Sequence, residues 1–275
     1  MDAGGCMRKT TWRATIALTA LFLLAVGAWG CAQNGPDTAP SDASEQPTGN
    51  DESNPASPPL PAWRSIDKQA LVAGLGWGEA ARGNAAAPRI ALTFDAGSEA
   101  GPTPAMLDML KSAGLHCTFF LSGQFVDAYP ELVTRMAADG HELANHSYSH
   151  PDFTTISAAE VDSQLARTEA RIVGLTGLSS KPFFRFPYGR RSNSLVDRVN
   201  ADGYLSVSWT VDAYDWEPSR APQAIYSRVM SGVSPGAIVL MHCGSPQEAQ
   251  VLPSIINDLR AAGYTLVTVS EVLSP

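Results

Sequence analysis

RIALTFD, at residues 89–95, is the stretch that decides the fold of this chain. Its apolar run is short and uninterrupted, as in a strand that is buried on both faces, and a carboxylate stands where the run ends. Strands of this kind occur in parallel sheets covered by helices. An aspartate after a strand is also a common helix cap, so Asp95 alone does not identify a site.

Downstream of this strand, short apolar runs alternate with helical patterns. Repeated βα units of this kind predict an α/β fold with a parallel sheet or barrel, in which functional residues follow the carboxyl ends of the strands. The patterns predict strands at 117–121, 142–145, 183–186, 205–207, 238–241 and 264–269. They predict helices at 104–113, 129–139, 157–176 and 252–262, the first three ending at Gly114, Gly140 and Gly177.

The N-terminus has the layout of a secretory signal. Basic residues between positions 8 and 13 precede an apolar run from 14 to 30. The run ends in AWGC, which resembles a bacterial lipobox with Cys31 as the lipidated residue, although Trp29 departs from the small residue usual there. Lipidation at Cys31, an uncleaved signal anchor and an ordinary cleaved signal all stay open. Each of them predicts an exported domain, and the first two predict attachment to the membrane.

The chain is expected to have four parts. Residues 1–31 form the signal or anchor, and residues 32–62 are rich in Pro, Ser and Asp, a composition that predicts a disordered linker. Residues 63–87 are expected to form an N-terminal extension that packs on the main domain, which covers residues 88–275. A single tethered domain of this kind is most simply a monomer.

Charge and cysteines limit the possible partners and bonds. The net charge of -8 disfavours a nucleic-acid partner, because an acidic chain repels phosphates. An exported protein could pair Cys117 with Cys243. However, Cys117 is expected near the start of one strand and Cys243 just past the end of another, so parallel strands would hold the thiols apart. We therefore expect two free, buried thiols.

Two further stretches place candidate site residues after predicted strands. His146 and His150 are four residues apart, which would put both rings on one face of a helical turn where they could share a metal ion. The alternative is a surface turn that happens to contain two histidines. Arg185 opens the stretch RFPYG, and a guanidinium there could orient a carboxylate through paired hydrogen bonds or simply be exposed beside a structural proline.

Aromatic and acidic residues gather in the last third of the chain. Trp209 precedes the stretch DAYDW at residues 212–216. Aromatic faces suit sugar rings, yet tryptophans are more often part of a core. His242 ends a predicted strand, where it could be a general acid or a core histidine with a satisfied hydrogen bond.

Taken together and in order, the stretches TFD (93–95), HSYSHP (146–151), RFPYG (185–189), DAYDW (212–216) and LMH (240–242) resemble the motifs of the polysaccharide deacetylase family, whose members share a NodB-type homology domain. The resemblance covers residues 88 to about 274. It implies a distorted (β/α) barrel and hydrolysis of N-acetyl groups on amino sugars of peptidoglycan or a chitin-like polysaccharide. It also implies a divalent metal, zinc in the first place, with cobalt, nickel or manganese as alternatives.

The resemblance also assigns roles by position. It implies that Asp95 is the catalytic base, that Arg185 orients it, and that the metal ligands are His146 and His150. It implies that His242 is the general acid, with Asp215 as its partner. The backbone N–H of Tyr188 would then be the oxyanion donor, and Trp216 would form a wall of the substrate groove.

One position departs from the family. The residue after the base is usually a second aspartate that ligates the metal, and here it is Ala96. Water could fill the vacant position, Ser98 or Glu99 could substitute, or metal binding could be lost. Because the other motif residues are kept, we expect a deacetylase with weakened or altered metal binding. The rivals are a non-catalytic sugar-binding lipoprotein, an enzyme of the same architecture that acts on a small amide, and a structural envelope protein.

Overall fold

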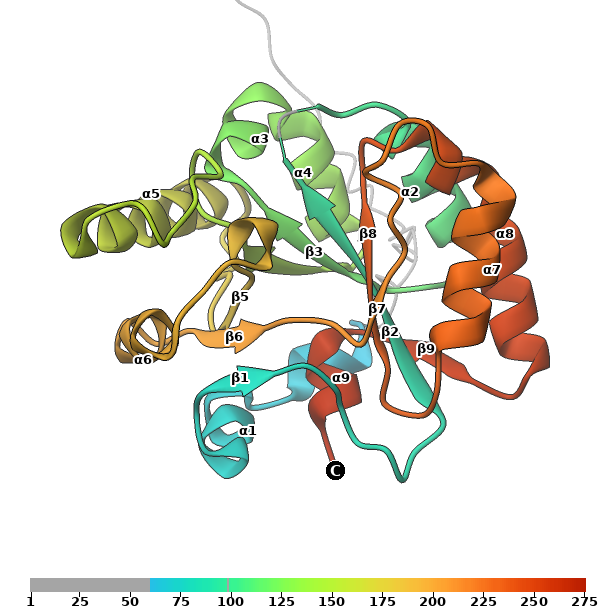
Figure 1. Ribbon diagram of the computed structural model, residues 1–275, viewed down its shortest axis with the longest axis horizontal. Helices are drawn as coiled ribbons and strands as arrows, with labels where there is room; N and C mark the ends of the chain where they lie inside the picture. The colour runs from blue at the N-terminus through green and yellow to red at the C-terminus, as the bar shows by residue number, and fades with distance from the viewer. Residues whose placement is uncertain (1–59, 98) are drawn as a thin grey trace, which may run out of the picture. The chain divides into compact units, whose positions relative to one another are not determined.

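A curled parallel sheet surrounded by helices forms the described part of the chain, which in this computed structural model comprises residues 60–97 and 99–275 (Figure 1). The strand order is β1-β6-β5-β4-β3-β2-β8-β7, and β9 pairs with β2. Every pairing within this sheet is parallel. No pairing joins β1 to β7 in the described residues, so the sheet curls into an open half-barrel, and the predicted distorted (β/α) barrel is confirmed.

The strands are short and lie in chain order around the curl, apart from β1 and β7–β9. Their bounds are β1 (Glu79–Ala80), β2 (Arg89–Ala96), β3 (Thr118–Leu121), β4 (Glu142–Asn145), β5 (Phe183–Phe184), β6 (Leu205–Val207), β7 (Val211–Asp212), β8 (Ile238–His242) and β9 (Thr265–Val267).

Helices cover the outside of the sheet, and α2, α7 and α8 lie side by side on one flank (Figure 1). Their bounds are η1 (Ala62–Ser65), α1 (Lys68–Leu75), α2 (Thr103–Ser112), α3 (Gly123–Ala128), α4 (Pro130–Ala138), α5 (Ala158–Thr176), η2 (Pro187–Gly189), α6 (Asn193–Ala201), α7 (Pro222–Gly232), α8 (Pro246–Ala261) and α9 (Val269–Leu273).

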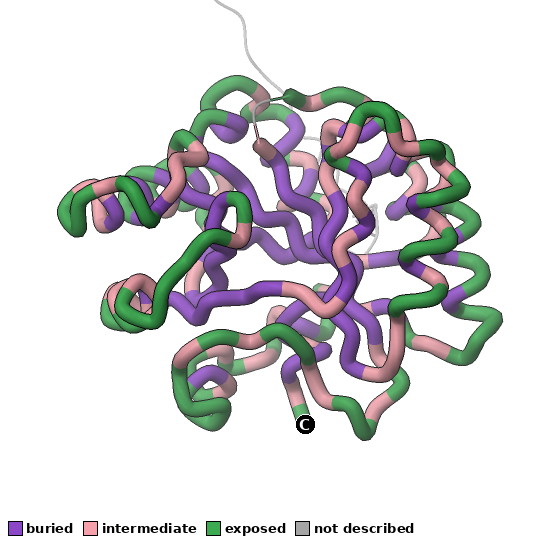
Figure 2. The backbone as a smooth tube through the Cα atoms, viewed as in Figure 1, coloured by how far each residue is buried: buried purple, intermediate pink, exposed green. Residues whose placement is uncertain are grey.

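Strand β2 is the centre of the sheet and is buried along its whole length after Arg89, as its apolar sequence predicts. Its side chains alternate between two surroundings. Ile90, Leu92, Phe94 and Ala96 belong to the main hydrophobic core, which fills the space between sheet and helices. Thr93 and Asp95 point to the inner side of the curl. Figure 2 shows the same division across the molecule, with burial along the strands and exposure on the outer turns of the helices.

Most of the predicted elements are present. The helix predicted at 157–176 is α5: the Ser157 hydroxyl caps its start by accepting a hydrogen bond from the Glu160 N–H, and Gly177, with a φ of 70°, ends it. The helices predicted at 104–113 and 129–139 correspond to α2 and α4. All six downstream strands are found within a few residues of their predicted positions.

Several predictions about the elements were wrong or incomplete. Regular structure begins before residue 89, since α1 and β1 precede β2. Three helices, α3, α6 and α7, were not predicted. Helix α8 starts at Pro246 rather than at 252, because Ser245 caps it and Pro253 is accommodated inside it. The short helix α9 at the end of the chain was also not predicted.

The cysteine prediction is confirmed. Cys117 and Cys243 are buried and free. Burial raises the pKa of the Cys117 thiol to about 12, so this thiol stays protonated and unreactive.

The predictions for residues 1–31 and for most of the linker lie outside the described residues, and the domain boundaries stay predictions. Among the described residues, none of the helices combines the length and the apolar character that crossing a membrane requires.

A buried carboxylate links several elements at the end of the half-barrel where β3 and β4 begin, which is called the lower end here. Glu142 in β4 is fully buried and accepts hydrogen bonds from the Thr118 hydroxyl in β3, at 2.8 Å, and from Ser270 in α9. Its other oxygen lies 2.8 Å from the Lys68 ammonium in α1. Nearby, the Trp63 indole N–H donates to the carbonyl of Gly140 at 2.8 Å. Residues ahead of β2 are thus bound to the sheet by polar as well as apolar contacts.

We expect Glu142→Ala to lower the free energy of unfolding by roughly 3–5 kcal/mol, because it leaves the nearly buried Lys68 ammonium and the Ser270 hydroxyl without their acceptor. Urea denaturation followed by circular dichroism measures the change. The control is Glu131→Ala, at an exposed position in the first turn of α4, where a loss of at most about 1 kcal/mol is expected. Equal effects of the two substitutions would contradict this account of the lower end.

Candidate active site

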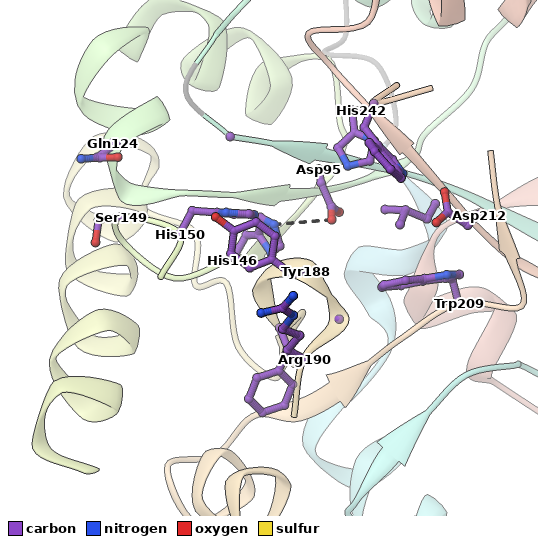
Figure 3. A pocket seen from close by; sticks show the side chains of 15 residues that line it. Asp95, Gln124, His146, Ser149, His150, Tyr188, Arg190, Trp209, Asp212 and His242 are labelled. Atoms are coloured by element: carbon purple, nitrogen blue, oxygen red, sulfur yellow. Dashed lines mark ion pairs between the residues drawn. The ribbon is translucent and has the colours of Figure 1, made fainter. Parts of the chain in front are cut away.

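A pocket of about 700 Å³ opens where the strands end. The carboxyl ends of β2, β4, β5, β7 and β8 all place polar residues in the pocket or on its floor, as parallel α/β folds lead one to expect (Figure 3). The lining residues are Asp95, Gly97, Gln124, His146, Ser149, His150, Phe186, Tyr188, Gly189, Arg190, Trp209, Asp212, Trp216, Leu240 and His242.

Asp95 is held by a buried ion pair on the floor of the pocket. Its Oδ1 accepts a hydrogen bond from Arg185 Nη1 at 2.7 Å, and both side chains are almost fully buried. Burial by itself raises the pKa of Asp95, but the charge of Arg185 and the nearby imidazoles outweigh it, and the pKa is lowered from its usual value of 3.8. Asp95 is therefore ionised at neutral pH, and its Oδ2 is directed away from Arg185 toward His146.

All three nitrogen atoms of the Arg185 guanidinium donate hydrogen bonds that fix the side chain. Its Nε donates to the carbonyl of Val207 at 3.1 Å, its Nη1 also donates to the Thr93 hydroxyl at 2.9 Å, and its Nη2 donates to the carbonyl of Ser208 at 3.3 Å. The guanidinium carbon lies 3.9 Å from the centre of the Phe120 ring. The carboxylate that Arg185 holds is thus oriented by contacts to three strands or their ends.

His146 has one ring nitrogen engaged and one directed at the carboxylate. Its Nδ1 lies 2.9 Å from the carbonyl of Arg185, and since a carbonyl can only accept, Nδ1 carries the proton. Its Nε2 is 3.5 Å from Asp95 Oδ2. Burial lowers the pKa of His146. A neutral ring with a free Nε2 lone pair, fixed through Nδ1 by a backbone carbonyl, is the usual form of a metal-binding histidine.

His150 packs against His146, although not through a helical turn. The two ring centres are 4.9 Å apart and the rings meet edge to face. The predicted helical turn is wrong, because Ser147 and His150 have φ values of 67° and 56° and break it. Instead, Asn145 Oδ1 accepts a hydrogen bond from the Ser147 N–H at 2.9 Å, and the Ser147 hydroxyl accepts one from the His150 N–H at 3.1 Å. Burial, followed by the charge of His146, lowers the pKa of His150 to about 4.

His242 and Asp215 form a second pair on the other side of the pocket. His242 Nδ1 is 2.8 Å from Asp215 Oδ1, and the His242 N–H donates to Oδ2 at 2.8 Å. Burial lowers the pKa of His242, but the hydrogen bond and charge of Asp215 outweigh it, so the pKa lies above the usual 6.5. Register places His242 directly beside Asp95 on the adjacent parallel strand.

The start of α8 supports this second pair from behind. The Ser245 hydroxyl donates to the carbonyl of Asp215 at 3.0 Å and accepts from the Glu248 N–H at 3.1 Å. Glu248 is fully buried, and burial together with the charge of Asp215 raises its pKa well above the usual value. A protonated Glu248 adds no second negative charge beside Asp215. Neither residue was identified from the sequence; the Ser-Pro pair that begins α8 was the available signal.

A strained turn forms the wall of the pocket beside His150. Tyr188 and Gly189 both have positive φ, 57° and 64°. A side chain at Gly189 would meet Trp209, because an added Cβ would lie 2.7 Å from its ring. The Tyr188 N–H makes no hydrogen bond to any described residue. The ring of Tyr188 is 64% exposed and meets the edge of His150, with ring centres 4.5 Å apart.

Aromatic side chains line the opposite wall. Trp216 is 52% exposed, and its ring centre lies 5.5 Å from that of Tyr214. Trp209 also lines the pocket. Figure 3 shows the Trp209 and His242 rings on one side of Asp95, and the His146, His150 and Tyr188 rings on the other. An exposed tryptophan beside an open pocket can pack on the face of a sugar ring.

The donors for a metal ion are fewer than a catalytic zinc site normally has. Ala96 is fully buried, and its methyl group belongs to the main core on the side of β2 away from Asp95. Of the suggested substitutes, Ser98 lies outside the described residues, and Glu99 is exposed and does not line the pocket. Within residues 60–97 and 99–275, no three His, Cys, Asp or Glu side chains are grouped to hold a metal ion. The two neutral imidazoles suit a divalent cation, but a third protein ligand is lacking among these residues.

The structure therefore brings all the candidate residues to one pocket or directly behind it. Arg185 and Asp215 do not line the pocket themselves, and each holds a residue that does. The sequence did not single out Gln124, Ser149 and Arg190, which complete the lining. Gln124 and Arg190 are exposed and carry no motif that distinguishes them from ordinary surface residues.

The chain is similar in sequence to known proteins. Residues 82–207 match the family model for polysaccharide deacetylase. The chain is 35% identical over 193 residues to peptidoglycan-N-acetylmuramic acid deacetylase PdaA of Bacillus subtilis, an alignment that covers 70% of this chain and 73% of that protein. It is 33% identical over 203 residues to chitooligosaccharide deacetylase of Azorhizobium caulinodans, covering 69% of this chain and 96% of that protein.

Solved structures give the same result. The structure of Bacillus subtilis PdaA, described as a family 4 carbohydrate esterase, superposes with a TM-score of 0.68 and 33% identity, and the match covers 74% of this chain and 87% of that one. A CE4 family pseudoenzyme from Bacillus anthracis superposes with a TM-score of 0.69 and 29% identity, covering 74% of this chain and 71% of that one.

We expect Asp215→Asn to lower the pKa of His242, because it removes the charge partner that raises this pKa and leaves the burial that lowers it. The protonated form of His242 is then lost at a lower pH than in the wild type. NMR titration of the labelled histidine rings measures the shift. Asp212→Asn is the control: Asp212 makes no hydrogen bond to His242, and its removal is expected to shift the pKa less. An unchanged His242 pKa in Asp215→Asn would refute this assignment.

Proposed function

The chain belongs to the polysaccharide deacetylase family, and on that premise we propose that it is a hydrolase that removes N-acetyl groups from amino sugars of a cell-wall polysaccharide. One observation carries the proposal most directly. An ionised carboxylate clamped by Arg185 and a histidine of raised pKa held by Asp215 face the same pocket from adjacent strands. Amide hydrolysis needs such a pair, since a proton must leave the attacking water and another must reach the departing amine.

Asp95 acts as the base in this proposal. Its Oδ1 is occupied by Arg185, so Oδ2 is the atom that takes a proton from water. A carboxylate fixed at one oxygen and free at the other loses little freedom when it acts. The lowered pKa keeps Asp95 ready in the ionised form over the whole neutral range.

His242 acts as the acid. Asp215 binds its Nδ1, which leaves Nε2 as the nitrogen that can reach the substrate. The raised pKa keeps the ring protonated at a higher pH than an ordinary histidine. Nε2–H then protonates the amine nitrogen as the bond to the acetyl carbon breaks, and acetate and a free amino sugar result.

The Tyr188 N–H stabilises the oxyanion. It is free of hydrogen bonds among the described residues and lies on a turn fixed by Gly189 and Trp209. A single preorganised donor of this kind contributes about 3–4 kcal/mol to catalysis. Trp216 supports the sugar ring from the opposite wall.

A divalent metal ion, zinc in the first place, would be held by His146 and His150. Both rings are neutral by virtue of their lowered pKa, and the Nε2 atom of His146 is free to ligate. When bound, the ion would supply a Lewis acid for the acetyl carbonyl. With Ala96 in place of a ligand, we propose that the ion is held more weakly than by three protein ligands. Cobalt, nickel and manganese stay alternatives.

We also propose that the domain works outside the cytoplasm as a monomer. The apolar segment at 14–30 and the linker composition of 32–62 support an exported domain held at the membrane by a lipidated Cys31 or an uncleaved anchor. Two of the relatives are named for peptidoglycan and for chitooligosaccharide deacetylation, so an extracellular polysaccharide is the proposed substrate.

A second candidate function is sugar binding without catalysis. Ala96 favours it, as does the absence of a third grouped ligand in the described part of the chain. The similarity to a family pseudoenzyme adds to this. The two functions share the pocket and its aromatic wall, so hydrolysis itself must decide between them.

The deciding measurement is acetate release from peptidoglycan and from chitin oligomers, with and without added zinc or cobalt. We expect metal-stimulated release that falls roughly 10²–10⁴-fold in Asp95→Asn, because the base is lost. His146→Ala should lose bound metal as well as activity. Asp197→Asn, at an exposed position on α6, should retain both. No release from any acetylated sugar, together with no bound metal, would make the sugar-binding protein the better account.

Ala96→Asp tests the missing ligand by metal binding rather than by activity. An ionised carboxylate is costly to bury in the core, so with zinc present we expect the end of β2 to turn the new side chain from the core toward the pocket. The variant should then bind zinc at least about tenfold more tightly than the wild type. Without metal, the variant should be less stable, because a carboxylate replaces a buried methyl group. Calorimetric titration with zinc gives the affinity. Ala96→Asn has the same volume without the charge; if it gains as much affinity as Ala96→Asp, ligation at this position is not the cause.

A further inference from the structure

Arg190 is the one arginine among the residues that line the pocket. It follows η2 directly, two residues after Tyr188, whose N–H is the proposed oxyanion donor. In Figure 3 its guanidinium lies below the Tyr188 ring, on the side of the pocket away from His242. The mechanism above gives this side chain no role.

Asp152 orients the Arg190 guanidinium but binds only one of its nitrogen atoms. Arg190 Nη1 donates to Asp152 Oδ2 at 2.7 Å. The Asp152 carboxylate is itself fixed, because Thr154 donates to it through both its N–H and its hydroxyl, and these bonds together with Arg190 lower its pKa to about 2. The Nε and Nη2 atoms of Arg190 make no hydrogen bond to any described residue, so one edge of the guanidinium stays available.

The pair adds little to the stability of the fold. The Arg190 side chain is 68% exposed, and exposed ion pairs contribute little because water screens them and the side chains lose freedom. A guanidinium held in one orientation beside a pocket is better suited to recognising a planar anion through two parallel hydrogen bonds.

The overall charge of the chain disfavours an anionic substrate unless a local cation offsets it. The chain as a whole has a net charge of -8, while within the pocket the charge of Asp95 is already paired with Arg185. Arg190 supplies a positive charge at the rim that an anionic sugar can reach. A neutral N-acetylglucosamine unit would need no such cation.

Substrate chemistry places the anion at a defined distance from the reacting acetyl group. In N-acetylmuramic acid, the carbon next to the one that bears the acetamido group carries a lactyl ether ending in a carboxylate. An acetyl oxygen at the Tyr188 N–H would therefore put this carboxylate a few ångströms away, on a wall of the pocket where Figure 3 shows the Arg190 guanidinium next to the Tyr188 ring.

We infer that Arg190, oriented by Asp152, is a specificity residue that binds the carboxylate of an acidic N-acetyl amino sugar, and so selects N-acetylmuramic acid units over neutral N-acetylglucosamine. The inference rests on the proposed deacetylase function and narrows its substrate. Arg190 acts in binding rather than in the chemical step.

The test compares Arg190→Gln with Arg191→Gln on two soluble substrates, a muramic-acid disaccharide and a chitin oligomer. Arg191 is the matched control, since it is adjacent and charged but bonds to Glu79 and to the carbonyl of Gly189 and does not line the pocket. For Arg190→Gln we expect the KM for the muramic substrate to rise roughly 10–100-fold, as for a lost hydrogen bond to a charged group. Its kcat, and both constants for the chitin oligomer, should stay close to those of the wild type.

A modified substrate and a direct binding measurement complete the test. Converting the lactyl carboxylate to its amide should raise the KM of the wild type as much as Arg190→Gln does and have no further effect on that variant. Equal losses on both substrates, or no loss on either, would overturn the inference. If the wild type releases no acetate at all, the proposed function fails, and calorimetric binding of the same two sugars to the wild type and Arg190→Gln then decides the role of Arg190 separately.

Discussion

The ion pair between Asp95 and Arg185 is the interaction on which the site depends. A charged pair taken out of water is expensive, and its mutual attraction offsets that cost only when the remaining donors are also satisfied. Here they are: the guanidinium donates to Thr93, Val207 and Ser208 as well as to the carboxylate. The curl of the sheet brings the ends of β2, β5 and β6 close enough for one side chain to reach all of them. The barrel thus supplies the acceptors, and the pair in turn joins strands that are distant in the chain.

Strained backbone is concentrated around this pair. Of the five non-glycine residues with positive φ in the described part of the chain, Ser147, His150, Tyr188 and Tyr214 lie in the segments that line the pocket or directly beside it. Such conformations cost of order 1–3 kcal/mol each and persist only where the surroundings enforce them. They are enforced here by two hydrogen bonds, in which the side chains of Asn145 and Ser147 accept from backbone N–H groups, and by the packing of Gly189 against Trp209. The rigid strands position the ionised groups, and the strained turns position the rings and the free N–H.

The features that could be predicted from the sequence are those that depend on residues close together in the chain. The apolar run of β2, the capped helix α5 and the motif residues after β4, β5 and β8 were all predicted, because burial and capping leave signals within a few residues. The path of the chain between His146 and His150 was not, since four-residue spacing suits a helix, and only the hydrogen bonds of Ser147 show otherwise. Arg190, Ser245 and Glu248 were missed for a different reason. Their roles come from residues that fold beside them from elsewhere in the chain, and no local pattern records such contacts.

The substitution at Ala96 separates two parts of the site that are usually considered together. The proposed base, Asp95, and the proposed acid, His242, are held by Arg185 and Asp215, and neither contact involves the position of Ala96. The Ala96 methyl is part of the hydrophobic core, so the strand loses nothing in packing from its small side chain. His146 is likewise fixed by a backbone carbonyl rather than by a neighbouring carboxylate ligand. The geometry of the two groups proposed for proton transfer is therefore independent of the residue at position 96. In the proposed function, this single strand-end position affects the affinity for metal while the rest of the pocket keeps its geometry.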